Sequence, residues 1–398
     1  MKMTNLLVAR VNYANEIVNG SKKQTLNLKK SGQIQMNDRL SFDKKEIQNF
    51  LGSVYKTAVE VVEVKELTDP NEDIKGFGYG TPVLIDVEVK GIRDRLVLHT
   101  VRPDKFGHER RSDRAQAILL DYDVFNRLPN HVEALGVGAF MQNGKIQVLN
   151  ETEEFFLITK YHSGRLFAED LKDLKRLLPE DRERVIALAD YLVNIHSVKF
   201  DSPSLYKRCI RDLLGHGEGI MGVIDSYPSD FTIASPERIK AIERKLIDWR
   251  WQVKGRTNRL SQVHGDFHPW NILFDVNNEF VVLDRSRGDY GEPADDVSAM
   301  SINFIFFSLQ MEGALLGSFR VLHDIFWDHY IQNTQDLELH SVIQPFYAWR
   351  ALVLAHPLWY PNLMDETRKR LFEFIETVLD VDWFDPRQIN EYLGVMSK

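Results

Sequence analysis

The stretch VHGDFHPWNILFDVNNEFVVLDRSRGD, residues 263–289, is the part of this chain that says most about its fold. Within it, two short apolar segments at 271–274 and 280–283 flank a run of turn-forming residues that includes two consecutive asparagines. Apolar segments separated by such a turn predict two antiparallel strands joined as a hairpin. The stretch therefore predicts a strand-turn-strand unit with polar residues at its ends.

Polar side chains are expected to meet at one end of this hairpin. An antiparallel hairpin returns its second strand to the level where the first began, so Asn271 and Asp284 should lie side by side. Asp266 lies on the loop that leads into the first strand. Mg²⁺ prefers oxygen ligands and is usually held by one or two protein groups plus substrate phosphates, which suits Asn271 and Asp284 as metal ligands. A carboxylate beside such a site, here Asp266, orients and deprotonates an attacking hydroxyl.

The motif formed by His264–Gly265–Asp266, His268–Pro269 and Asn271 resembles that of the aminoglycoside phosphotransferase and choline kinase-like family of small-molecule kinases. The resemblance implies an α+β fold that is bilobal and protein-kinase-like, with a β-rich N-lobe and a mostly helical C-lobe. It also implies an enzyme that uses ATP and Mg²⁺ to move the γ-phosphoryl group to a hydroxyl of a small molecule, with Asp266 as the base.

Further residues are expected to support the catalytic loop. His264 should brace Asp266 through hydrogen bonds to the backbone rather than transfer a proton itself. His268 either contacts phosphate or metal or has a structural role. Asp296 ends a Gly-Glu-Pro-Ala-Asp-Asp run that resembles the family's Gly-Asp-Pro-x-x-Asp pattern, and it should anchor the loop from the start of a helix. Because Asp296 follows Asp284 too closely for an activation segment, phosphorylation of protein side chains is disfavoured.

Segments rich in β-branched residues predict the strands of the N-lobe at 58–64, 83–89 and 96–101. Three glycines at alternate positions, Gly76, Gly78 and Gly80, lie between the first two segments. Glycine lets backbone amides approach a phosphate closely, so these residues either cover the phosphates of the nucleotide or form an ordinary turn. Their place ahead of the second strand favours the nucleotide-covering loop.

The resemblance assigns further positions to the nucleotide. The family usually places Lys or Arg on the third strand, where His99 aligns best, and Arg102 would need a β-bulge to serve instead. In the predicted helix 115–128, Asp121 is the best match to the acidic partner of that basic residue and Asp123 is the second; the alternative for either is a solvated helix face. The apolar run 155–161 predicts a buried strand that ends at Tyr161, where the hinge would meet adenine. Because the usual strand-three cation is missing, a catalytically weak or inactive nucleotide-binding regulatory module is the alternative function.

The order of these segments divides the chain into three parts. Residues 1–42 form an N-terminal extension without an assigned role, 43–161 form the β-rich nucleotide-binding N-lobe, and 162–398 form the helical C-lobe with the catalytic loop and the substrate site. Apolar periodicity predicts the helices: they span 44–51, 115–128, 184–196, 236–251 and, as a buried helix, 300–311.

Composition restricts the partners and the compartment. A net charge of −8 over 398 residues argues against a nucleic-acid binder, which needs a basic patch or stripe. The single cysteine, Cys209, excludes an intramolecular disulfide and fits a reducing compartment. The first residues lack the apolar core of a signal peptide, and 300–311 is too short to span a bilayer. We expect a cytoplasmic monomer or homodimer that binds a small-molecule hydroxyl substrate, with no nucleic-acid or membrane partner.

Two readings of the acceptor's chemistry stay open in the sequence. Acidic residues outnumber basic ones after about residue 300 and would attract a cationic amine, but the acids at 365–376 have the spacing of a solvated helix face, which is favoured. The aromatic run 348–360 predicts core packing, with an aromatic wall for a cation as the alternative. Arg285 and Arg287 either reach phosphate or an anionic substrate, or form outward-facing salt bridges.

Overall fold

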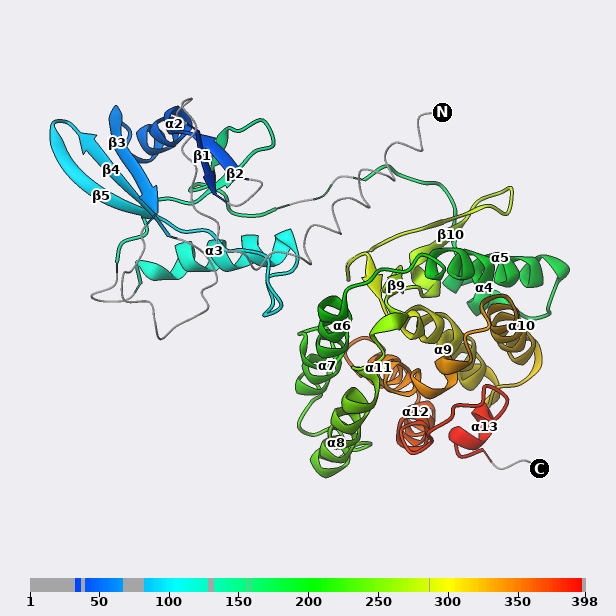
Figure 1. The fold of residues 1–398 in the computed structure, drawn as a ribbon. Helices are drawn as coiled ribbons and strands as arrows, with labels where there is room; N and C mark the ends of the chain where they lie inside the picture. The colour runs from blue at the N-terminus through cyan, green and yellow to red at the C-terminus, as the bar shows by residue number, and fades with distance from the viewer. Residues whose placement is uncertain are drawn as a thin grey trace. The chain divides into compact units, whose positions relative to one another are not determined.

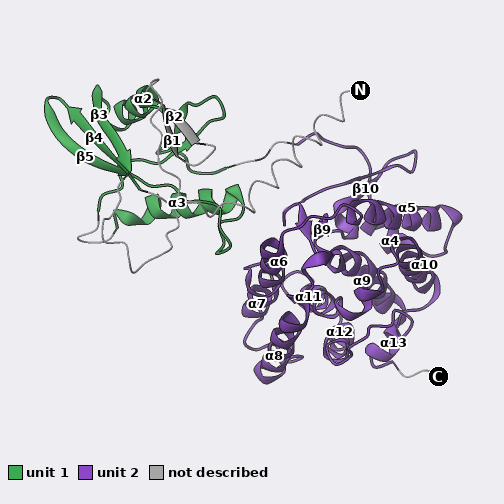
Figure 2. Cartoon of the chain, viewed as in Figure 1, with its two compact units in different colours: residues 1–157 green, residues 158–398 purple. Residues whose placement is uncertain are grey.

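A computed structural model describes residues 33–36, 40–66, 82–127, 132–155, 157, 159–285 and 287–395. The chain separates into two compact units, Met1–Leu157 and Ile158–Lys398 (Figure 2). The first unit is rich in strands and the second is mostly helical (Figure 1), so the predicted α+β class is confirmed. The sequence placed the boundary between the lobes four residues later, after Tyr161.

A three-stranded antiparallel sheet forms the core of the first unit, in the order β3 (Val59–Glu66), β4 (Val83–Val89) and β5 (Ile92–Leu98). Lys90 and Gly91 join the last two strands with positive φ angles of 51° and 80°, as a two-residue hairpin turn requires. This tight turn starts the third strand four residues earlier than predicted. His99 consequently lies one residue beyond the strand on which it was expected.

Helix α2 (Lys44–Tyr55) packs on this sheet (Figure 1). Asp43 caps its N-terminus, because the carboxylate accepts a hydrogen bond from the amide of Lys45 at 3.0 Å. The helix buries Ile47 and Leu51 among the strand residues of the first unit's core. The helix predicted after Asp43 is confirmed.

The described part of the first unit also contains four short strands and one helix: β1 (Gln33–Met36), β2 (Leu40–Asp43), α3 (Arg111–Phe125), β6 (Gly138–Phe140) and β7 (Ile146–Val148). Strands β1 and β2 pair with each other, as do β6 and β7, both antiparallel. None of the side chains of α3 is buried.

The buried strand predicted for 155–161 is wrong. Among the described residues of this segment no strand forms, and the side chains of Phe155, Leu157 and Tyr161 are 64%, 87% and 91% exposed. The boundary between the two units falls inside this segment. An apolar run indicates a preference for burial, but it does not specify which element will cover it.

The second unit has a helical core built around α9 (Pro293–Glu312), most of whose 20 residues are buried. A helix that is apolar on all sides needs neighbours on all sides. Helices α10 (Gly317–Thr334) and α11 (Gln344–Ala355) pack against it, and α5 (Pro179–His196) packs along α10 (Figure 1). The buried helix predicted at 300–311 is confirmed. The other helices are α4 (Phe167–Asp173), α5 (Pro179–His196), α6 (Pro203–Gly215), α7 (Ile220–Asp225), α8 (Pro236–Val253), α10 (Gly317–Thr334), α11 (Gln344–Ala355), α12 (Asp365–Val378) and α13 (Ile389–Tyr392).

The predicted hairpin is also confirmed. Strands β10 (Ile272–Phe274) and β11 (Phe280–Val282) pair antiparallel, and β8 (Arg165–Leu166) extends the sheet beside β10. The short pair β9 (Ser261–Gln262) and β12 (Tyr290–Gly291) closes the ends of the stretch that contains the hairpin. Within the part of the chain that the structure describes, no helix is long and apolar enough to cross a membrane.

Candidate active site

The loop between β9 and the hairpin is held by Asp296, a buried residue in the first turn of α9. Its Oδ1 accepts a hydrogen bond from the amide of Gly265 at 2.7 Å, and its Oδ2 accepts one from the amide of His264 at 2.8 Å. His196 of α5 donates to the same Oδ2 at 3.1 Å and accepts from the hydroxyl of Tyr330 at 2.8 Å. The loop is thus tied through one carboxylate to two core helices.

Burial and hydrogen bonding act on Asp296 in opposite directions. Burial raises the pKa of this carboxyl group, but His196, His264 and the loop amides lower it by more, so the pKa lies below its ordinary value. A carboxyl group with a lowered pKa stabilises the fold at a pH above its unfolded pKa of about 3.9. That contribution is lost as the pH falls through the lower pKa of the folded state.

We expect Asp296→Asn to lower the free energy of unfolding at pH 7 by about 2–3 kcal/mol, because an amide cannot accept from both backbone N–H groups. The deficit relative to wild type should begin to shrink as the pH falls below about 4, where the unfolded state takes up a proton, and should disappear only below the lower pKa of the folded wild-type carboxyl group. Denaturant unfolding between pH 3 and pH 7 measures both effects. Asp328→Asn, which breaks an exposed ion pair with Arg387, is the control and should cost under about 1 kcal/mol. A deficit that does not depend on pH would contradict this account.

Gly265 has a reason to be glycine in this loop. Its φ angle is 87°, in the left-handed region, and a Cβ built on it would lie 3.0 Å from the Cβ of Arg287. The imidazole of His264 lies along the same loop, where its Nδ1 accepts from the amide of Asp266 at 3.3 Å. Burial lowers the pKa of His264, which keeps the ring neutral and able to accept that hydrogen bond.

Asp266 is surrounded by two guanidinium groups and an imidazole. The guanidinium of Arg350 forms an ion pair with its Oδ1, Nη2 of Arg287 lies 4.0 Å from the same oxygen, and Nε2 of His268 lies 3.5 Å from its Oδ2. Burial raises the pKa of Asp266, but Arg350, the hydrogen bond with His268 and Arg287 together outweigh burial and hold the pKa well below its usual range. Asp266 is therefore ionised at neutral pH.

Asn271 lies next to the end of β11, because its carbonyl accepts a hydrogen bond from the amide of Leu283 at 2.8 Å. Its side-chain Nδ2 donates to the carbonyl of Asp266 at 3.1 Å. The side-chain nitrogen of Asn271 is thereby occupied by the loop that carries Asp266, and Oδ1 is the atom left to bind a cation. The structure brings Asp266, Asn271 and the end of the second strand together.

Asp284 follows β11 with an exposed carboxylate that makes no hydrogen bond or ion pair with any other described residue. Its φ angle is 51°, a left-handed backbone conformation that costs an L-residue roughly 1–2 kcal/mol. Strained backbone of this kind often occurs at sites with a function. An uncompensated carboxylate held in this way fits a metal ligand.

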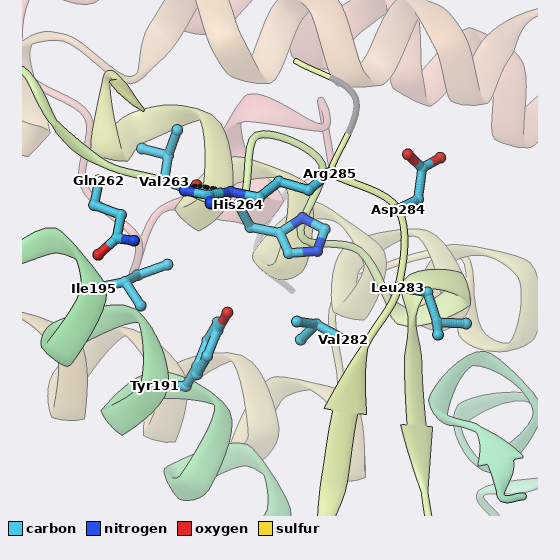
Figure 3. A pocket seen from close by; sticks show the side chains of 9 residues that line it. All are labelled: Tyr191, Ile195, Gln262, Val263, His264, Val282, Leu283, Asp284 and Arg285. Atoms are coloured by element: carbon cyan, nitrogen blue, oxygen red, sulfur yellow. Dashed lines mark hydrogen bonds between the residues drawn. The ribbon is translucent and has the colours of Figure 1, made fainter. Parts of the chain in front are cut away.

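A pocket of about 250 Å³ lies beside this residue (Figure 3). The hydroxyl of Tyr191, from α5, points into it, and Asp284 stands at its edge (Figure 3). The pocket is lined by Tyr191, Ile195, Gln262, Val263, His264, Val282, Leu283, Asp284 and Arg285.

The donor set at this end of the hairpin fits Mg²⁺ rather than a metal that needs several protein ligands. Among the described residues, no three His, Cys, Asp or Glu side chains gather as a metal-binding group. One amide oxygen of Asn271 and one carboxylate of Asp284 are what Mg²⁺ uses when substrate phosphates and water complete its shell.

The residues expected to bind the nucleotide are not gathered into a described site. Gly76, Gly78 and Gly80 lie outside the described residues. His99 is exposed beyond the end of β5, and Arg102 follows it outside any strand. The other two expected nucleotide residues, Asp121 on α3 and Tyr161, are also exposed. No described residue forms an ion pair with Asp121.

The structure separates the two arginines that follow Asp284. Arg285 donates to the carbonyl of Val263 at 2.9 and 3.1 Å and to the carbonyl of Asp289 at 3.0 Å. It therefore joins the two ends of the stretch 263–289. Its guanidinium serves neither as a phosphate contact nor as an outward-facing salt bridge. Arg287 stacks on the ring of Trp349 at 4.5 Å. Its guanidinium therefore lies on the side of the loop that faces α11.

Arg350 is the residue of the site that the sequence did not reveal. The aromatic run around it predicts core packing, and Trp349 is indeed buried. Arg350 is only 8% exposed, and it bridges Asp266 to Asp295, whose Oδ1 lies 2.5 Å from its Nη2. An arginine inside an apolar helix run was the available signal, because a buried guanidinium requires an anionic partner.

Part of the chain matches the model of a known protein family. Residues 144–314 match the profile of the Phosphotransferase enzyme family, which confirms the resemblance carried by the His-Gly-Asp motif. No curated protein sequence matches the chain at a significant level.

Solved structures of small-molecule kinases are similar over most of the chain. An ethanolamine kinase of Plasmodium vivax is 14% identical over 83% of this chain and 81% of its own, with a TM-score of 0.33. The amicoumacin kinase hAmiN, bound to AMP-PNP and Ca²⁺, is 15% identical over 83% and 91%, with a TM-score of 0.38. A choline kinase, LicA from Streptococcus pneumoniae, is 13% identical over 88% and 99%, with a TM-score of 0.30.

Proposed function

Because residues 144–314 match the Phosphotransferase enzyme family, we propose that this protein transfers the γ-phosphoryl group of ATP to a hydroxyl of a small molecule with the help of Mg²⁺. One observation carries the proposal. The loop held by Asp296 places the ionised Asp266 in contact with Asn271, beside the strand end from which Asp284 projects. This is the set of groups that phosphoryl transfer needs.

Each side chain then has a separate task. Asp266 accepts a hydrogen bond from the acceptor hydroxyl and orients its oxygen toward the γ-phosphorus. It takes the proton as the new bond from oxygen to phosphorus forms, while the bond from the γ-phosphorus to the bridging oxygen breaks and ADP leaves. Asn271 and Asp284 would hold Mg²⁺, which when bound neutralises charge on the phosphates. His264 and Asp296 keep the loop in place, and we assign His268 to supporting Asp266.

Residues that precede the loop of Asp266 in the sequence supply the nucleotide contacts in this proposal. Gly76, Gly78 and Gly80 cover the phosphates, and either His99 or Arg102 provides positive charge that Asp121 orients. The backbone near Tyr161 meets adenine. These roles rest on the motif resemblance.

ATP turnover tests the proposal. The purified full chain is given ATP, with and without Mg²⁺, and a panel of amino alcohols, amino sugars and neutral sugars, and ADP formation is measured. We expect Mg²⁺-dependent ADP formation that rises with at least one acceptor class. Thermal stabilisation by ATP without turnover on any acceptor would instead favour the regulatory nucleotide-binding module.

Asp284→Asn is expected to abolish the enhancement of ATP binding by Mg²⁺ while it changes the free energy of unfolding by no more than about 0.5 kcal/mol. The small effect on stability follows from the exposed carboxylate without a described partner and from the tolerance of asparagine for positive φ. Isothermal titration with ATP at several Mg²⁺ concentrations measures binding, and denaturant unfolding measures stability.

Asp289→Asn is the matched control, because Asp289 is an exposed carboxylate in the same loop. It should leave the Mg²⁺ dependence unchanged. If the two variants lose the enhancement equally, the assignment of Asp284 as a ligand is wrong.

A further inference from the structure

Arg350 joins two acidic residues that come from different elements. It lies on α11, 84 residues beyond Asp266 in the sequence, and its Nη1 pairs with Oδ1 of Asp266. Its Nη2 lies 2.5 Å from Oδ1 of Asp295, in the first turn of α9, and 3.4 Å from the carbonyl of Gly265. One guanidinium thus contacts the catalytic loop twice and a core helix once.

The guanidinium of Arg350 also stacks on an aromatic ring. Its centre lies 4.1 Å from the centroid of the Trp349 ring, and Trp349 itself donates to the carbonyl of Glu218 at 3.2 Å. A planar guanidinium that binds two carboxylates and stacks on an aromatic ring has little rotational freedom. Arg350 is therefore a rigid support, unlike a flexible surface ion pair.

This arrangement gives the two oxygens of Asp266 different surroundings. Oδ1 pairs with Arg350 and lies 4.0 Å from Nη2 of Arg287, whereas Oδ2 lies 3.5 Å from Nε2 of the His268 imidazole. Oδ2 is consequently the oxygen that an acceptor hydroxyl can reach. The direction in which it points is set by the bond that holds Oδ1.

We propose that Arg350 is a positioning residue that clamps Asp266 against Asp295 so that Oδ2 faces the acceptor hydroxyl. The inference rests on the proposed phosphotransferase function. It assigns Arg350 no contact with substrate, so its loss lowers the rate of transfer rather than the affinity for ATP.

A structural ion pair is the competing explanation, and a second buried arginine separates the two. Arg368 on α12 is buried like Arg350, but it donates to the carbonyls of Ala355, at 2.6 Å, and Tyr360. It contacts no residue of the catalytic loop in the described structure. Arg368→Met therefore reproduces the loss of a buried guanidinium without altering Asp266.

Steady-state ATP turnover is measured for wild type, Arg350→Met, Arg350→Lys and Arg368→Met, with the best acceptor of the panel or with water. We expect Arg350→Met to lower kcat about 10²-fold, the effect of a small displacement of a catalytic group, with little change in KM for ATP. Arg350→Lys should recover part of that loss, because a cation still pairs with Asp266. Arg368→Met should lose stability but keep wild-type kcat below its unfolding temperature.

Removal of Arg350 alone leaves two largely buried carboxylates without their cation, which threatens folding. The double variant Arg350→Met with Asp295→Asn removes one of these charges. It should be more stable than Arg350→Met, yet its kcat should stay as low, because Asp266 is still unclamped. Circular dichroism melts accompany each kinetic measurement.

The outcomes distinguish the two proposals. Wild-type kcat in either folded Arg350→Met variant would overturn the positioning role alone, as would an Arg350→Lys enzyme no more active than Arg350→Met. Equal loss of kcat in Arg368→Met would reduce Arg350 to a structural ion pair. A wild type that turns over no ATP with any acceptor or with water overturns the phosphotransferase function and the positioning role together.

Discussion

Asp266→Asn is expected to lower kcat for phosphoryl transfer about 10²- to 10⁴-fold, because it removes the group that orients and deprotonates the acceptor hydroxyl. The interaction between this carboxylate and the hydroxyl matters chiefly in the transition state, so ATP should bind almost as tightly as before. The asparagine keeps the size of the side chain, and Arg350 keeps its ion pair with Asp295. The comparison of kcat with ATP affinity from titration calorimetry measures the effect.

Asp275→Asn is the control for this experiment. Asp275 lies in the turn of the same hairpin, where its Oδ1 accepts from the amides of Asn277 and Glu279 at 2.8 and 2.9 Å. An asparagine oxygen can accept the same bonds, so turnover should not change. If the Asp266→Asn enzyme keeps wild-type turnover, the mechanism proposed here is wrong.

Arg259→Met is expected to have the largest effect on stability, about 3–5 kcal/mol, because it leaves a buried anion without its cation. Arg259 and Glu292 are 4% and 2% exposed, with Nη2 of Arg259 2.7 Å from Oε1 of Glu292. The arginine also pairs with Asp336 at 2.5 Å, and the hydroxyl of Tyr206 donates to Glu292 at 2.7 Å. Denaturant unfolding measures the loss.

Two further variants separate charge from packing at this pair. Arg259→Met combined with Glu292→Gln removes both charges and should recover part of the loss, because no buried ion remains unpaired. Arg165→Met is the control: the Arg165 side chain is about half exposed, so the loss of its ion pairs should lower the free energy of unfolding by under about 1 kcal/mol. A double variant less stable than Arg259→Met would show that the buried charge is not the cause.

The hairpin and its polar end could be predicted because the signals are local. Asn271 and Asp284 are separated by two apolar segments and a turn, and antiparallel pairing alone places Asn271 beside Leu283, the residue before Asp284. The same holds for the cap of α2 at Asp43. Each feature depends on residues within a short stretch of chain.

The features that the sequence did not reveal depend on distant partners or on backbone detail. Arg350 reaches Asp266 across 84 residues of sequence, and no local pattern specifies that contact. His99 falls beyond β5 because Lys90 and Gly91 form a turn shorter than the connection that was expected. The apolar run at 155–161 indicated burial, but hydrophobicity does not name the element that would cover it.

The left-handed backbone of Asp284 has a consequence for efforts to engineer this protein. Glycine adopts such a conformation without steric penalty, so the backbone at this position favours a residue that has no carboxylate. Directed evolution for heat resistance alone would then discard the acid and yield a hardier chain with a disabled site. A library selected for activity should keep aspartate at position 284, whereas a library selected only for thermal survival should lose it. This difference would show that stability and activity impose opposite demands on this residue.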